Sequence, residues 1–202
     1  VTIKSPREIE LMRKAGEILA QVHEELHAAV HPGMSTLDID KLGERLIRSH
    51  GCIPSFKNYN GYPASICVSV NDEVVHGIPH KDHIIQEGDI VSLDAGLIYK
   101  GYHSDAARTH LVGECSPEAK KLVEVTKQSF FEGIKFAKAG HHLFEISAAI
   151  GVTVACLVIM GTFTLVAVNA DAQLRDLESE NEFLAFVDES LTRSEAEGLK
   201  AQ

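Results

Sequence analysis

The sequence lacks any run of basic residues, any closely spaced pair of cysteines and any apolar segment at its start. Its formal net charge is −10, which argues against nucleic acid as a primary partner because no basic stretch is present to meet phosphates. The four cysteines lie far apart, without a Cys-x-x-Cys pair, as is typical of reduced thiols in a cytoplasm. The polar first residues indicate the start of a helix rather than a signal peptide. We therefore expect a cytoplasmic protein.

Clear helix and strand signals follow one another along the first 140 residues. Ser5, Pro6 and Glu8 have the spacing of a capping box, and apolar residues follow at helical spacing. With 202 residues, of which 45% are hydrophobic, we expect one domain, with room for an appendage. The predicted elements are a helix from Ser5 to before His31, a helix from Ser35 or Thr36 to Gly51, strands over 64–70 and 90–93, a β-hairpin, and a helix from Ser116 to Gly140.

Two aspartates on the predicted hairpin are the strongest signal of chemistry. A two-residue turn at 100–101 (Lys-Gly) sets a register that pairs Asp94 with Ala107 and Gly96 with Asp105. Both carboxylates then project from the same face as diagonal neighbours. Like charges this close on a buried strand need a proton or a cation between them, and oxygen ligands suit a divalent metal. The alternative is a pair of solvated aspartates on a strand that faces water.

An internal repeat connects the two ends of this region. The Ser-Pro pair at 5–6 recurs at 116–117, and each pair opens a predicted helix. The pattern at 33–39 recurs at 140–146, a shift of 107 residues. The sequence thus begins a second copy of its own helix–helix–strand unit. At the same shift the counterpart of the hairpin falls at the end of the chain or beyond it, so the second copy is predicted to be incomplete.

Residues 146–170 contain no charged side chain, and three structures remain open for them. The segment is long enough for a helix that crosses a bilayer. Its β-branched residues also fit a buried pair of strands over 152–160 and 162–168. A third alternative is one hydrophobic soluble helix over 145–168. Residues 171–202 are acidic with leucines at helical spacing, which predicts a solvated amphipathic helix pair or a loose tail.

Three segments resemble the type I methionine aminopeptidases in residue identity, order and spacing. They are residues 60–79 (NGYPASICVSVNDEVVHGIP), 88–96 (GDIVSLDAG) and 104–109 (SDAART). The resemblance covers about residues 2–150 and implies an α+β pita-bread fold, with helices packed on an antiparallel sheet in two pseudo-symmetric halves. Such a fold would explain the repeat. We therefore expect a catalytic-domain portion over 1–150 and a tail over 151–202, hydrophobic to residue 170 and acidic after it.

Carried over by position, the resemblance implies a metallopeptidase site. Asp94 and Asp105 would be ligands of two divalent metal ions (cobalt, manganese or iron), and His76 would contact the scissile peptide or the amine of the substrate. The implied activity is removal of the N-terminal methionine from nascent proteins, so the implied partners are peptides that begin with methionine, near the ribosome. The residues implied to line the pocket for the methionine side chain are Tyr59, Tyr62 and Cys67. A strand-end role for His76 and core packing for these three residues are the structural alternatives.

The family has five metal ligands, and the sequence supplies two of them. The other three ligands of the family are one histidine and two glutamates. The histidine belongs to a His-Gly-Ile-Gly-type motif and one of the glutamates to a Glu-Pro segment, and neither motif is present. His103, His110, His141 and His142 match no ligand of the family and are interpreted as surface or loop residues. Two functions therefore remain: the aminopeptidase, and a truncated, catalytically incomplete family member that binds metal or peptide weakly. In a third version of the protein, residues 146–170 tether it to a membrane.

Overall fold

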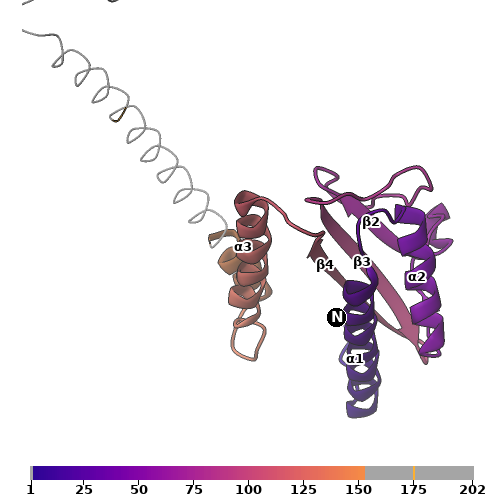
Figure 1. Cartoon of the computed structure of the whole chain (residues 1–202). Coiled ribbons are helices and arrows are strands. Elements are labelled where there is room, and N and C mark those ends of the chain that lie inside the picture. The colour runs from indigo at the N-terminus through magenta and orange to yellow at the C-terminus, as the bar shows by residue number, and fades with distance from the viewer. Residues whose placement is uncertain (1, 153–174, 176–202) are drawn as a thin grey trace, which may run out of the picture. The chain divides into compact units, whose positions relative to one another are not determined.

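The structure, a computed structural model, describes residues 2–152 and residue 175 (Figure 1). The chain divides into two compact units, Val1–Glu124 and Val125–Gln202, and the boundary predicted at residue 150 stays a prediction. The elements are α1 (Pro6–Ala29), α2 (Thr36–Ser49), β1 (Ile53–Pro54), the 3₁₀ turn η1 (Tyr59–Gly61), β2 (Ile66–Val70), β3 (Ile90–Tyr99), β4 (Tyr102–Leu111) and α3 (Pro117–Ile134). Residues 143–152 are also helical.

β3 is the strand on which the sheet is built. It pairs antiparallel with β4 over its whole length, and with both β1 and β2 along its other edge. The β3–β4 turn has positive φ at Lys100 (48°) and Gly101 (87°), as a two-residue hairpin turn of the primed type requires. The register pairs Asp94 with Ala107 and Gly96 with Asp105. The predicted hairpin and its register are therefore confirmed.

Helices α1 and α2 cover one face of the sheet (Figure 1), with α1 against β3 and β4 and α2 against β1 and β2. Side chains alternate between the two faces of a strand, and the alternation in β2 and β3 sends the aliphatic residues toward the helices. The buried core residues contributed by these two strands are Ile66, Val68, Val70, Val91, Leu93, Ala95 and Leu97. The same alternation places Cys67, Asp94 and Asp105 on the opposite face, so one hydrophobic core holds all the strands that carry the candidate ligands.

The internal repeat is present in the backbone. Ser5 caps α1 by accepting a hydrogen bond from the amide of Glu8, and Ser116 accepts one from the amide of Ala119 at the start of α3. The glycines that precede the second helix of each copy, at 33 and 140, both have a φ of 91°. Three residues after each glycine a helix begins, at 36 and at 143. The two copies therefore share the same capped helix and the same left-handed turn.

α3 is shorter than predicted, because it ends at Ile134 instead of continuing toward Gly140. The chain leaves the helix through two tight i→i+3 bonds, from the amides of Phe136 and Ala137 to the carbonyls of Gly133 and Ile134. The turn lets the helix at 143–152 pack back on α3 through Gly133, where any side chain would overlap Ile150.

Only part of the predicted tail can be compared with the structure. Residues 146–152 are helical, so the strand predicted to start at residue 152 does not begin there. Residues 153–170 lie outside the described residues, as do 171–202 apart from residue 175, which is helical. Among the helices that the structure describes, none is long and apolar enough to cross a membrane.

Candidate metal centre and substrate pocket

Asp94 and Asp105 occupy the face of the hairpin that points away from α1 and α2. Asp94 is half-buried in the central strand and Asp105 is exposed on β4. Oδ1 of Asp94 is buried and has no hydrogen-bond partner among the described residues. Burial raises the pKa of the Asp94 carboxyl, and the nearby charge of Asp105 raises it further. The fold thus holds two carboxylates together at an energetic cost.

This environment fits a divalent cation. A buried carboxylate oxygen without a donor, beside a second carboxylate, is stabilised when a positive charge lies between the two, and carboxylate oxygens are ligands of hard divalent ions. No cluster of three or more histidine, cysteine, aspartate or glutamate side chains suited to a metal occurs within the residues described. Asp94 and Asp105 therefore fit as two members of a larger ligand set.

His76 lies close to this pair on the loop after β2. Its electrostatic interaction with Asp94 lowers the pKa of that carboxyl, opposing the larger effect of burial. The backbone of His76 is in the left-handed region, with a φ of 57°, which is costly for a residue with a side chain and persists only where the surroundings enforce it. The side chain is exposed. The structure therefore brings His76 to the candidate metal centre in a strained conformation.

Gly77 fixes the position of this loop against β2. Its carbonyl accepts a hydrogen bond from the amide of Val68 at 3.0 Å, and its own amide donates to Oγ of Ser69 at 3.1 Å. A side chain at this position would overlap the Val68 carbonyl. The close approach of two backbones therefore requires glycine immediately after His76.

We expect Gly77→Ala to lower the free energy of unfolding by at least about 2 kcal/mol, because the added methyl group forces the loop away from β2. Urea unfolding followed by circular dichroism measures the loss. Gly16→Ala is the matched control: the new methyl on α1 meets nothing closer than Oγ of Ser104 at 3.9 Å, and helix propensity predicts a gain of up to about 1 kcal/mol. Equal stability of the two variants would contradict the expectation.

The three predicted pocket residues lie in different environments. Cys67 is buried, pairs directly with Asp94 across the sheet, and has a thiol pKa raised mainly by burial. Tyr62 is half-buried, and its hydroxyl lies 3.1 Å from the carbonyl of Ile66 and 3.2 Å from that of Gly77. Tyr59 is 68% exposed, so core packing is wrong for this residue. Tyr62 and Cys67 come together beside Asp94, and Tyr59 lies on the η1 turn that precedes them.

The interpretation of His110 as a surface or loop residue is wrong. It lies in β4, is 5% exposed, and its Nδ1 is 2.9 Å from Nδ1 of His27 on α1. Side chains at even positions of β4, such as Ala106, face the helices, whereas Asp105 faces the other way. Residue 110 is at an even position and therefore lies on the helix-covered face. His103 is exposed but lies in β4 rather than in a loop, and His141 and His142 are exposed outside the helices.

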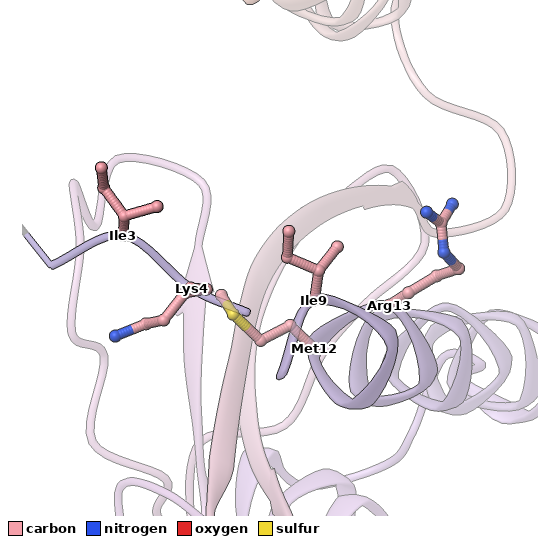
Figure 2. A pocket seen from close by; sticks show the side chains of 5 residues that line it. All are labelled: Ile3, Lys4, Ile9, Met12 and Arg13. Atoms are coloured by element: carbon pink, nitrogen blue, oxygen red, sulfur yellow. The ribbon is translucent and has the colours of Figure 1, made fainter. Parts of the chain in front are cut away.

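A separate cavity of about 600 Å³ lies at the start of α1. Figure 2 shows that Ile3 and Lys4 reach it from the segment before α1, and that Ile9, Met12 and Arg13 belong to the first turns of the helix. The cavity shares no residue with the predicted site, so it gives no support to the metal centre.

Comparison with known proteins decides the family. The profile described as "Metallopeptidase family M24" matches residues 10–163, more than half of the chain. The chain belongs to metallopeptidase family M24. Membership implies a divalent metal cofactor, in agreement with the environment of Asp94, and confirms the predicted resemblance.

Individual relatives are similar to this M24 chain over about three quarters of its length. A methionine aminopeptidase of Clostridium acetobutylicum is 51% identical over 150 residues, covering 74% of this chain and 60% of the relative. Methionine aminopeptidase 1 of Bacillus subtilis is 50% identical with the same two coverages. The chain therefore spans about 60% of the length of the curated relatives that it matches.

Solved structures agree with these matches. The methionine aminopeptidase of Thermotoga maritima superimposes with a TM-score of 0.75 at 41% identity, covering 78% of this chain and 63% of the other. That of Rickettsia prowazekii gives a TM-score of 0.73 at 34% identity, covering 76% and 61%. The α+β pita-bread fold predicted for this M24 chain is confirmed over the matched region.

Proposed function

We propose that this chain acts in metal-dependent removal of N-terminal methionine, with Asp94 and Asp105 as its metal ligands. The observation that carries the proposal is the buried, unpartnered Oδ1 of Asp94 beside the carboxylate of Asp105, in a chain about half identical to methionine aminopeptidases over 150 residues. Two ions of cobalt, manganese or iron are the cofactor that we propose.

The chain's own residues have distinct roles in this proposal. Asp94 and Asp105 would hold the divalent ions, which when bound would supply an activated water molecule and polarise the scissile carbonyl. His76 on its strained loop would hydrogen-bond the substrate at the scissile peptide or the amine. Cys67 presents a neutral, polarizable sulfur, since burial raises its pKa. The hydroxyl of Tyr62 is engaged with main-chain carbonyls, which leaves its ring to line an apolar pocket suited to a thioether.

A second candidate is binding of metal or a peptide N-terminus without turnover. It is favoured by the convergence of only two carboxylates among the residues that the structure describes. A site with two protein ligands holds a divalent ion weakly and lacks a positioned general acid or base. The two candidates share Asp94 and Asp105 and differ in whether a product is released.

Release of methionine from a Met-Ala-Ser peptide, with cobalt or manganese added, separates the two candidates. We expect turnover that needs the metal and is abolished in Asp94→Asn. Asp82→Asn is the control, because Asp82 is an exposed aspartate outside the site, with 72% of its side chain accessible. An absence of turnover at every metal concentration would rule out the aminopeptidase and leave the binding protein.

A further inference from the structure

One carboxylate of α2 binds the start of β2 directly. Asp40 is 7% exposed, and its Oδ1 accepts hydrogen bonds from the amides of Ser65 at 2.8 Å and Ile66 at 3.0 Å. Hydrogen bonds from backbone amides to a buried carboxylate are among the stronger ones in proteins. α2 therefore fixes the two residues that immediately precede Cys67.

A second carboxylate of α2, one turn later, binds the other end of the same segment. Glu44 contacts Nζ of Lys57 at 2.6 Å, and this contact is the main cause that lowers the pKa of Glu44 to about 2. Between the two acids, Gly43 lets the helix approach so closely that an added Cβ would lie 2.9 Å from Cδ1 of Ile66. One face of α2 thus holds residues 57–66 at both ends.

Tyr59 and Tyr62 lie inside the segment that is held in this way. The hydroxyl of Tyr62 reaches the carbonyl of Ile66, the residue whose amide binds Asp40, and also the carbonyl of Gly77 beside His76. A continuous set of hydrogen bonds therefore runs from the helix through the start of β2 to the loop of the candidate catalytic histidine. Cys67 follows in the strand, opposite Asp94.

We propose that Asp40 and Glu44 are positioning residues that set the substrate pocket by clamping residues 57–66 onto α2. Neither carboxylate contacts substrate in this arrangement; both act through the tyrosines and the cysteine that line the pocket. The clamp determines the fit of an unbranched thioether side chain, and this specificity role depends on the function proposed above. The stabilisation of residues 57–66 against local opening does not depend on that function and can be measured without catalysis.

Alkylation of Cys67 by N-ethylmaleimide, measured peptide by peptide with mass spectrometry, reports the state of the clamp. The thiol is buried, so its labelling requires local opening of the segment. We expect Asp40→Ala to raise the labelling rate of Cys67 at least fivefold relative to that of Cys115. Asp40→Asn should stay within about twofold of the parent protein, because its amide oxygen can still accept both hydrogen bonds.

Asp38→Ala is the matched control on the same helix. Asp38 is an exposed carboxylate that contacts Ser35 at the N-terminus of α2 and, at 3.9 Å, Nζ of Lys41 on the same helix, so its loss weakens the helix without touching residues 57–66. The proposal would be overturned if Asp40→Ala accelerated the labelling of Cys67 and Cys115 equally. It would also be overturned if Asp38→Ala or Asp40→Asn raised the labelling rate of Cys67 as much as Asp40→Ala does. If Asp40→Ala does not fold, Glu44→Gln should raise the Cys67 rate about twofold, and an unchanged rate there would overturn the proposal.

Kinetics tests the specificity role. In a chain that turns over Met-Ala-Ser, Asp40→Ala should raise KM at least fivefold with a smaller change in kcat, and should lower the preference for methionine over leucine at the first position. A fall in kcat alone, with KM and the preference unchanged, would overturn the specificity role. Absence of turnover in the parent chain counts against the proposed function only, because the labelling experiment needs no activity.

Discussion

Replacing Asp94 with asparagine should raise the thermal stability of the metal-free protein and remove its response to divalent metal. In the metal-free parent, a half-buried carboxylate faces a second carboxylate, and its Oδ1 has no partner among the described residues. Removing that charge should stabilise the fold by about 1 kcal/mol, as substitutions at strained functional sites commonly do. The melting temperature should then rise by about 3 °C.

The metal response should move in the opposite direction. A ligand at one hundred times its dissociation constant stabilises the folded state by about 2.7 kcal/mol, so manganese or cobalt should raise the melting temperature of the parent by several degrees. Asp94→Asn and Asp105→Asn should both abolish this rise, whereas Asp82→Asn should retain it. A metal-dependent rise that survives in Asp94→Asn would place the cation elsewhere in the protein.

The stability of the protein should also fall steeply in mild acid because of His110. Burial, with a smaller contribution from the nearby His27 and His23, lowers the pKa of this imidazole from 6.5 to about 4. The unfolded chain takes up this proton near pH 6.5, whereas the folded protein does so only near pH 4. Between these values the unfolded state binds more protons, so the free energy of unfolding decreases as the pH falls, by about 3 kcal/mol in total.

Urea unfolding at intervals from pH 7.5 to 4.0 measures this slope. His110→Gln should remove most of the slope between pH 6.5 and 4, because glutamine does not titrate, while His80→Gln should leave it unchanged because His80 is exposed. His23 contributes in the same direction: it is fully buried, burial lowers its pKa, and its Nδ1 has no partner among the residues described. If the free energy of unfolding fell with pH equally in His110→Gln and in the parent protein, His110 would not be the cause of the acid destabilisation.

The local parts of the candidate site follow from the sequence because short-range rules determine them. A two-residue turn at 100–101 leaves one register for the hairpin, and that register places Asp94 and Asp105 on one face. The capped helix starts at Ser5 and Ser116 and the left-handed glycines at 33 and 140 follow from equally local patterns. Each of these features is decided by residues that are close neighbours in the sequence.

The long-range parts could not be derived in this way. The bonds from Asp40 to Ser65 and Ile66 span 25 and 26 residues, and no periodicity in either segment indicates them. The prediction for His110 is wrong because its side chain lies on the face of β4 that α1 covers. The sequence does not distinguish such a buried polar residue from a solvent-exposed one until the packing of α1 on β4 is known. Polar contacts between distant segments depend on the arrangement of whole elements, and hydrophobic patterns carry no information about them.

Because β3 is the central strand, the backbone around Asp94 should open far less often than the backbone around Asp105. Asp94 lies in β3, which pairs with all three other strands of the sheet. The amide hydrogens of β3 should therefore exchange with solvent only when the whole unit unfolds. Asp105 lies in β4, which pairs with β3 alone within the described residues, and such a strand can open by itself. Transient opening of β4 would therefore move Asp105 away from Asp94, which stays in place for as long as the protein is folded.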